Sequence, residues 1–334
     1  MKTSSGIDRR TLVALAGGTM AAVVLPRRLL AQAAAPKLRV ASVKHGSLGW
    51  LLQTIKAEGL DQKNGVAIEV VEVATNQAGP VALLAGEADV IVSDWTWALR
   101  QRGLGEKVKF SPFTSALGAL MVPAASDIKS AADLKGRKIG VAGTAIDKSW
   151  ILFRAYCGKV HGYDVAKETT PVFGAAPLMT EELKNGRLDA VLNFWPFAAR
   201  LAGAGYRRIV SMDEVVKALG VEPTPAFVGF IWKEQTGEAK GDALKGFLAA
   251  ASAGNAVLKE KDSAWERVRD LVRPSSDAEL AAIRDYYRSG IPAPWGAADT
   301  AAAAKLTELL MEHGAKDILG PGTRFDDALF HSGT

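Results

Sequence analysis

Cysteine and histidine are scarce in this 334-residue chain, and their scarcity excludes several kinds of site. Cys157 is the only cysteine, so no internal disulfide bond can form. Its place on the apolar stripe of a predicted helix favours a buried, unreactive thiol. The four histidines, His45, His161, His313 and His331, are scattered without metal-ligand spacing. We therefore expect no metal site and no cofactor.

Motifs that carry catalysis are missing as well. The sequence contains no G-x-S-x-G, H-E-x-x-H, paired C-x-x-C or G-x-G-x-x-G segment. The segment from Gly143 to Ser149 only partly resembles a phosphate-binding loop. Such a loop has glycine directly before its lysine, whereas here Asp147 precedes Lys148. These absences favour a protein that is not an enzyme.

The N-terminus has the features of an export signal. A twin-arginine pair, Arg9-Arg10, precedes an uncharged, mostly apolar run over residues 11–25. Ala31-Gln32-Ala33 is an A-x-A cleavage site, so residues 1–33 are predicted to be a signal peptide for twin-arginine export to the periplasm. The alternative is an uncleaved membrane anchor, although the run is shorter than the roughly 20 residues that a span needs.

Most of the chain's positive charge lies in this signal. Residues 1–33 contain five basic residues and one acidic residue, a net charge of +4 out of +5 for the whole chain. The remainder therefore carries only +1, and we expect no nucleic-acid partner.

Strand and helix patterns alternate after the signal, which predicts an α/β fold. Strands are expected at residues 38–43, 66–73 and 89–93, separated by helices that begin near Ser47 and Val81. After Pro223-Thr224-Pro225 a strand is expected at 226–232, and the rest of the chain is predicted to be largely helical.

An internal repeat indicates two similar halves. Residues 83–100 read LLAGEADVIVSDWTWALR, and residues 183–200 read LKNGRLDAVLNFWPFAAR. Six positions are identical at an offset of 100: Leu83/Leu183, Gly86/Gly186, Asp89/Asp189, Trp95/Trp195, Ala98/Ala198 and Arg100/Arg200. The repeat predicts two βαβ lobes. Lobe one would comprise residues 37–118 and 226–334, lobe two residues 119–225, and the two crossings between them would act as a hinge.

These segments resemble the periplasmic solute-binding proteins of the nitrate/sulfonate/taurine type, which include the thiamine-pyrimidine-precursor binders. The matching stretches are L-x-x-G-x-x-D-V at 83–90, DLKGRKIGV at 133–141 and L-x-x-G-x-x-D-A at 183–190. The resemblance covers roughly residues 38–273. It implies a type II periplasmic binding protein fold, a small-molecule ligand in an interlobe cleft, and docking to an inner-membrane ABC permease.

Ligands of open α/β sheets bind beyond the carboxyl ends of the strands, and three such places contribute candidate residues. Lys44 and His45 follow the first strand, and Gln77 precedes Gly79-Pro80. The alternative for Lys44 and His45 is a solvated lysine and a hydrogen-bonded surface histidine. For Gln77 it is an ordinary loop position.

The repeat places a second set of candidates at equivalent strand ends. Asp94 and Trp95 follow the strand of one half, and Asn193 and Trp195 follow that of the other. Two indoles in one cleft would hold a planar ring or a quaternary ammonium. The alternative is that both tryptophans pack a helix against the sheet.

The third set of candidates opens the first helix of lobe two. Thr144 and Lys148 are the ligand candidates, because a helix N-terminus offers N–H groups and Lys148 adds a charge. Asp147 would form a capping box with Thr144 as the N-cap residue. The mixture of lysine, aspartate, amide and tryptophan fits a zwitterion, an amine or a heterocycle better than a bare dianion.

Together these features predict a monomeric, periplasmic substrate-binding component of an ABC importer. It would capture a sulfonate, an amine or zwitterion, or a planar heterocycle by hinge closure. The alternatives are an enzyme or a sensor built on the same two-lobe fold.

Overall fold

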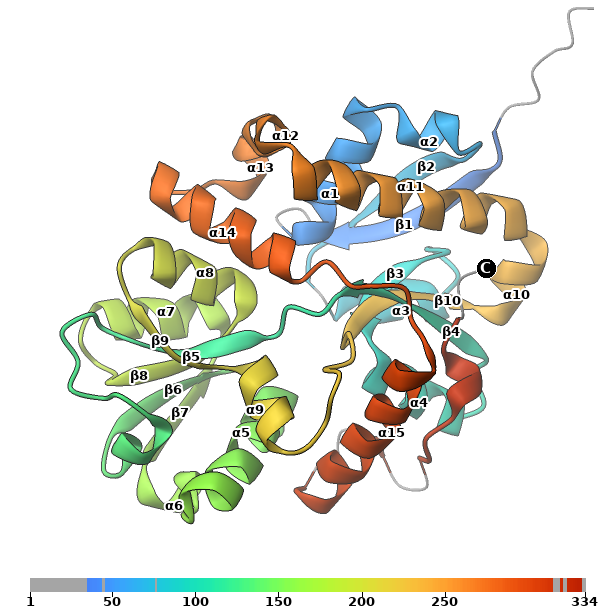
Figure 1. Ribbon diagram of the computed structural model, residues 1–334. Helices are drawn as coiled ribbons and strands as arrows, with labels where there is room; N and C mark the ends of the chain where they lie inside the picture. Colours follow the sequence, from blue (N-terminus) through green and yellow to red (C-terminus); the bar gives the residue numbers. More distant parts are fainter. Residues whose placement is uncertain (1–34, 44–45, 76, 315–318, 321–322, 332–334) are drawn as a thin grey trace, which may run out of the picture. The chain divides into compact units, whose positions relative to one another are not determined.

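The computed structural model describes residues 35–43, 46–75, 77–314, 319–320 and 323–331 (Figure 1). The predicted signal peptide and the candidates Lys44 and His45 lie outside these ranges. Within them, no helix is both long enough and apolar enough to cross a membrane.

Lobe one contains two small groups of strands. Strands β1 (Lys37–Val43) and β2 (Ala67–Val73) pair in parallel, and β10 (Val228–Lys233) lies between β3 (Ile91–Asp94) and β4 (Val108–Thr114) in an antiparallel sheet. A single bridge between Val40 and Val90 links the two groups. Strand β10, from the second half of the chain, thus pairs with two strands from the first half.

Lobe two contains one mixed five-stranded sheet in the order β7-β6-β8-β5-β9. Its strands are β5 (Gly118–Val122), β6 (Lys138–Ala142), β7 (Thr170–Gly174), β8 (Ala190–Phe194) and β9 (Arg207–Ser211). The pairings β7-β6 and β6-β8 are parallel, and the pairings β8-β5 and β5-β9 are antiparallel. Because β6, β7 and β8 run parallel, their carboxyl ends lie at the same edge of the sheet.

Helices cover both lobes. Those of the first two thirds of the chain are α1 (Ser47–Ala57), α2 (Leu60–Lys63), α3 (Ala78–Leu84), α4 (Trp95–Gly103), α5 (Lys148–Tyr156), α6 (Val165–Glu168), α7 (Ala176–Lys184), α8 (Trp195–Gly203) and α9 (Met212–Ala218). The C-terminal helices are α10 (Glu234–Ala239), α11 (Gly241–Glu260), α12 (Asp262–Arg267), α13 (Arg269–Val272), α14 (Asp277–Ser289) and α15 (Ala297–Glu312). Short helical turns are η1 (Ala131–Leu134), the π-helix η2 (Cys157–His161) and η3 (Asp327–Leu329).

The two repeat segments have the same structure. Each has a strand followed at once by a nine-residue helix, α4 from Trp95 and α8 from Trp195. The two aspartates also correspond, because Asp89 accepts a hydrogen bond from the backbone N–H of Arg39 at 2.8 Å and Asp189 accepts one from that of Lys138 at 2.7 Å. The aspartate therefore ties the start of the repeat's strand to β1 in lobe one and to β6 in lobe two.

The chain crosses between the lobes at two places. It passes from β4 to β5 through residues 115–117, and it returns between α9 and β10. The backbone carbonyl of Leu117 accepts a hydrogen bond from the N–H of Trp195, and that of Phe227 accepts one from the N–H of Trp95. The first residue of each repeat helix thus fixes one crossing segment.

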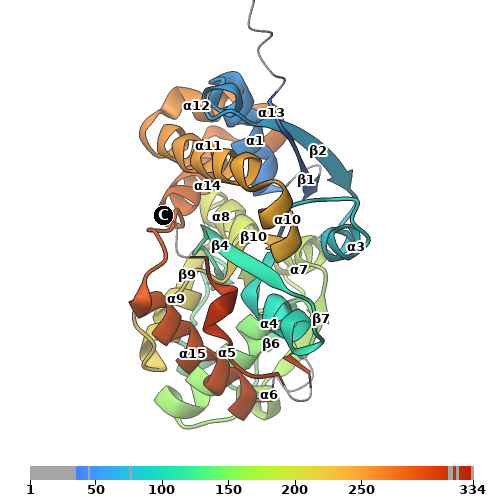
Figure 2. The same ribbon diagram turned by 90° about the vertical axis from the view of Figure 1, so that its right-hand side faces the viewer.

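Helices from the end of the chain pack against both lobes. Helix α11 lies beside α1 in both views, where a Cβ on Gly254 would stand 2.8 Å from a methyl carbon of Leu51 (Figures 1 and 2). Helix α14 contacts α8 of lobe two, and α15 contacts α5. The described residues from Ala35 onward form one unit. The predicted membership of residues 226–334 in lobe one therefore omits contacts that α14 and α15 make with lobe two.

Candidate ligand-binding cleft

A cavity of about 600 Å³ lies where the strand ends of both lobes meet. Lobe one contributes the ends of β1, β2, β3 and β4 and the N-terminus of α1. Lobe two contributes the N-termini of α5, α8 and α9, and both crossing segments supply side chains. The location agrees with the rule that ligands of α/β sheets bind beyond the carboxyl ends of the strands. Its volume is that of an ordinary small-molecule site.

An ion pair between the lobes lines this cavity. Lys148 Nζ, at the start of α5, lies 3.1 Å from Oδ2 of Asp94, the N-cap residue of α4. Both side chains are largely buried, with exposed fractions of 26% and 21%. The structure therefore brings together two predicted candidates from opposite lobes.

Asp94 and Asp147 both cap helices at the cavity. Asp94 accepts hydrogen bonds from the Trp97 backbone N–H at 2.9 Å and from the Thr96 hydroxyl. Asp147 accepts one from the Ser149 backbone N–H at 2.9 Å. The predicted capping box is wrong, because α5 begins at Lys148 and Asp147 itself is the N-cap residue, leaving Thr144 outside the helix.

Asp94, Asp147 and Lys148 influence one another's pKa. Burial raises the pKa of Asp94, but the Lys148 ammonium and the donors from Thr96 and Trp97 outweigh burial and hold that pKa below its usual range. Burial lowers the pKa of Lys148, yet Asp94 and Asp147 together raise it above its usual range. For Asp147 burial dominates, so its pKa is raised. Lys148 and Asp94 are therefore both charged at neutral pH.

Aromatic side chains form the other wall. Trp195 and Trp50 both line the cavity, with their ring centroids 6.0 Å apart in an edge-to-face contact. Behind them, Trp50 packs on Trp265 and Tyr287. Phe113, Phe194 and Phe197 complete this wall. A cavity with an apolar wall and a few charged groups suits a small organic ligand.

Trp95 does not line the cavity, although its repeat partner Trp195 does. The Trp95 side chain has no exposed surface, and its ring stacks on Phe227 with the centroids 5.1 Å apart. The prediction that the two indoles face one cleft is therefore corrected. Trp95 packs α4 against the returning chain, which was the alternative stated for both tryptophans.

Three further candidates lie away from the cavity lining. Asn193 is 3% exposed, and its side-chain amide donates to the backbone oxygen of Ala176 and to the Thr180 hydroxyl. Gln77 and Thr144 are exposed to solvent beside the cavity-forming loops. None of these three residues lines the cavity.

Trp50 and Arg200 are two of the cavity residues that were not candidates from the sequence. Trp50 lies in the first turn of α1, shortly after the end of β1, so its position beyond a strand end could have indicated this role. Arg200 also lines the cavity, and its guanidinium contacts the Glu279 carboxylate and donates to the backbone oxygens of Val272 and Arg273. Its repeat partner Arg100 is exposed, so the repeat alone gave no indication of this role.

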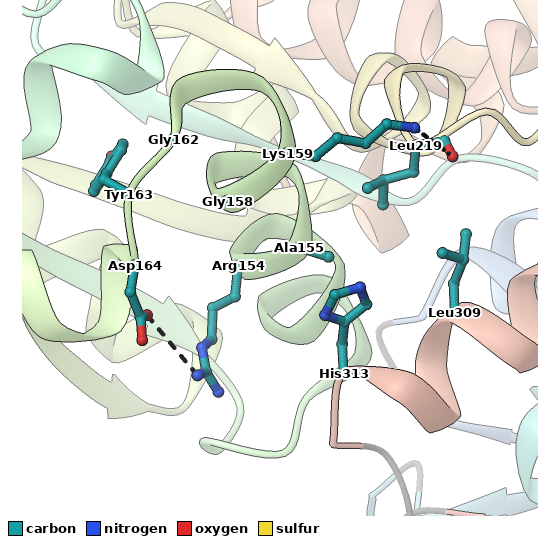
Figure 3. A pocket seen from close by; sticks show the side chains of 10 residues that line it. All are labelled: Arg154, Ala155, Gly158, Lys159, Gly162, Tyr163, Asp164, Leu219, Leu309 and His313. Carbon is teal, nitrogen blue, oxygen red and sulfur yellow. Dashed lines mark hydrogen bonds and ion pairs between the residues drawn. The ribbon is translucent and has the colours of Figure 1, made fainter.

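A second cavity, of about 650 Å³, lies around the π-helix (Figure 3). Arg154 approaches Asp164 at 3.9 Å there, and Lys159 Nζ donates to the Leu219 backbone oxygen at 3.1 Å. No predicted site residue lines this cavity, and it is not formed by the carboxyl ends of strands. The interlobe cavity is therefore the better candidate site. The described residues also contain no cluster of histidine, cysteine or carboxylate side chains that could hold a metal ion.

A family model described as "NMT1/THI5 like" matches residues 55–263, more than half of the chain. The chain belongs to the NMT1/THI5-like family. This membership confirms the resemblance drawn from the sequence motifs. No curated protein matches the sequence of this NMT1/THI5-like chain.

Solved structures share the fold of this family member at low sequence identity. The periplasmic aliphatic sulphonate-binding protein SsuA from Escherichia coli has a TM-score of 0.71 at 17% identity, over 89% of this chain and 92% of that one. The alkanesulfonate-binding protein SsuA from Xanthomonas axonopodis, bound to MOPS, has a TM-score of 0.65 at 16% identity, over 88% and 98%. The desulfurization enzyme DSZB has a TM-score of 0.59 at 16% identity, over 88% of this chain and 96% of that one. The fold is therefore that of the periplasmic binding proteins, and at least one enzyme shares it.

Proposed function

We propose that this protein is the exported substrate-binding component of an ABC importer and that it captures a small organic solute between its lobes. The observation that carries the proposal is the interlobe cavity, which receives side chains from both lobes and both crossing segments. A solute that contacts both lobes stabilises their closed arrangement, which a permease can recognise. Family membership and the fold shared with two SsuA proteins support this function.

The proposed ligand contacts are Asp94, Lys148 and Trp195, together with Trp50 and Asp147. Each lines the cavity, and they come from the N-termini of α1, α4, α5 and α8. Lys44 and His45 directly precede the lining residue Gly46 in the sequence. We therefore also propose them as ligand contacts, on the basis of the sequence prediction. The predicted export signal and periplasmic location, and a permease as partner, belong to the same proposal.

A screen of small organic solutes by thermal shift, followed by calorimetry, tests the function. A solute that binds only the folded protein raises its melting temperature. Ser93→Trp should abolish this shift, because Ser93 lines the cavity and a tryptophan there would fill it. Ser289→Trp is the matched control, since Ser289 is exposed at the end of α14, and it should bind like the unmodified protein. Equal binding by both variants would place the ligand elsewhere.

An enzyme is the second candidate, because DSZB shares this fold. Among the lining residues that the structure describes there is no histidine or cysteine, so binding is the first candidate and catalysis the second. Incubating the protein with each bound solute and analysing the solute by mass spectrometry separates the two. An unchanged solute supports the binding protein, and turnover would support the enzyme.

A further inference from the structure

Four of the described residues that line the interlobe cavity have charged side chains, and one of them, Arg200, has a counterion that does not line the cavity. The Arg200 guanidinium contacts Glu279, whose side chain is only 8% exposed, and it also donates to two backbone oxygens. This arginine therefore has a buried counterion of its own. Among the described lining residues, the charge available to a ligand therefore comes from Asp94, Asp147 and Lys148.

These three groups do not balance. Among the described lining residues, Lys148 supplies the only ammonium. Its Nζ contacts Asp94 at 3.1 Å, and it is also attracted to the carboxyl group of the adjacent residue Asp147. The Asp147 side chain packs directly against Gly143. A Cβ on Gly143 would lie 3.1 Å from the Asp147 side chain, and the φ of +103° at Gly143 is one that favours glycine. Among the described lining residues, the Asp147 carboxyl group thus lacks a positive partner of its own. Because burial raises its pKa, a positively charged ligand beside it would stabilise its ionised form.

An independent feature of the aromatic wall also indicates a missing partner. Trp50 is 2% exposed and lines the same cavity, but its Nε1–H has no hydrogen-bond acceptor among the described residues. Buried indole N–H groups usually have an acceptor, because an unsatisfied buried donor is unfavourable. A ligand that places an acceptor near Trp50 would remove this cost.

We propose that the solute bears a positively charged nitrogen that lies against Asp94 and Asp147, an apolar body against Trp195, and an acceptor for the Trp50 N–H. The inference rests on the proposed function and deepens it by naming the substrate class. It separates this chain from the two SsuA neighbours, whose names refer to sulfonates. A sulfonate at the same position would meet the surplus carboxylate, while the one remaining arginine is held by Glu279.

The experiment compares head groups on one body. The probes are 2-phenylethylamine, 2-phenylethanol and 2-phenylethanesulfonate, measured by calorimetry beside the solutes found in the general screen and sorted by charge. The amine should bind at least tenfold more tightly than the sulfonate, and the screen should be enriched in cations. Tighter binding of sulfonates, or of neutral solutes, would overturn the substrate class while leaving the solute-binding function intact. If no solute of any class binds, the proposed function fails, and this inference fails with it.

Charge variants provide a second, independent measurement. Asp94→Asn and Asp147→Asn keep an oxygen that can cap α4 and α5, because asparagine is as good an N-cap residue as aspartate. Each should weaken binding of the tightest cation tenfold or more. Asp164→Asn is the matched control, because Asp164 caps α6 in the same way outside the interlobe cavity, and its binding should be unchanged.

Lys148→Gln distinguishes a cation site from an anion site. Removing this ammonium leaves both carboxylates free, so a cation should bind at least as tightly as before. A site built around Lys148 for an anion would instead lose affinity. A tenfold loss of cation affinity in Lys148→Gln, or unchanged affinity in both aspartate variants, would overturn the assignment. Circular dichroism of each variant establishes that the comparison is between folded proteins.

Discussion

The Trp95 ring stacks on the Phe227 ring, with 5.1 Å between their centroids and an angle of 19° between their planes. The same pair is joined through the backbone, where the Trp95 N–H donates to the Phe227 oxygen at 3.1 Å. Phe227 lies in the segment by which the chain returns to lobe one. Trp95 therefore holds a crossing segment in place.

Trp95→Ala should strongly lower the free energy of unfolding, while the folded variant should bind the ligand with nearly unchanged affinity, because Trp95 is buried and does not line the cavity. Removing a fully buried tryptophan from a packed core costs about 3–5 kcal/mol. Chemical denaturation followed by circular dichroism measures this loss. In Trp195→Phe, by contrast, an aromatic ring remains in the wall while the indole that lines the cavity is lost, so the expected change is mainly in ligand affinity. Weaker binding by Trp95→Ala at full stability would contradict this division of roles.

Acid should destabilise the protein through Asp89. Burial raises the pKa of this carboxyl, but hydrogen bonds from Arg39 and Lys240 outweigh burial and lower the pKa from 3.8 to about 2. Because the folded-state pKa is depressed, the stabilisation is present above pH 3.8 and is lost as the pH falls toward 2. The expected contribution is about 2 kcal/mol.

Asp89→Asn tests this pH dependence. The variant should be less stable than the unmodified protein at pH 7, and the difference should shrink between pH 4 and pH 2. Urea unfolding at each pH measures both curves. Asp242→Asn is a suitable control, because Asp242 is exposed at the start of α11. Parallel curves for Asp89→Asn and the unmodified protein would refute the assignment.

Much of the fold follows from local patterns in the sequence. The offset of 100 residues indicates a strand at equivalent positions in the two repeat segments, and β3 and β8 lie there. Strand β4 was overlooked, because Pro112 interrupts its pattern and proline removes a backbone donor. Proline is tolerated there because β4 is an edge strand and its pairing with β10 is irregular beside Gly229, opposite Pro112.

The candidate site was harder to predict, because burial depends on contacts between distant segments. Trp95 and Trp195 have equivalent backbone positions, yet Phe227 and Phe330 cover only Trp95. Both partner rings lie outside residues 83–100, so this segment alone could not indicate the packing. The pairing of Asp94 with Lys148 likewise joins residues 54 positions apart on different lobes. Sequence reasoning could place each residue at a strand end but could not pair them.

The export route can be tested at the two arginines of the predicted signal. Changing Arg9 and Arg10 together to lysine should retain the protein in the cytoplasm, since the twin-arginine pathway reads the pair itself. Fractionation followed by immunoblotting measures the location. Changing Arg27 and Arg28 to lysine keeps the charge and leaves the pair intact, so export should continue. Export of the Arg9 and Arg10 variant at the normal level would contradict the twin-arginine assignment.

Arg200 and Glu279 offer a test of how α14 is fastened to lobe two. Glu279 is 6% exposed, and its backbone lies against Gly203, where a Cβ would stand only 2.5 Å from the Glu279 Cα. Removing one member of a buried ion pair leaves the other charge unpaired and typically costs 3–5 kcal/mol. We therefore expect Arg200→Ala to lower the free energy of unfolding by about 3 kcal/mol.

The repeat supplies the matched control for this last prediction. Arg100 occupies the equivalent position on α4 but is exposed, so Arg100→Ala should change stability by less than about 0.5 kcal/mol. Glu279→Gln should resemble Arg200→Ala, and the double variant should cost less than the sum of the two single changes. Additive losses would mean that the two side chains act independently. In that case the packing of Gly203 against Glu279, rather than the ion pair, would hold α14 on lobe two.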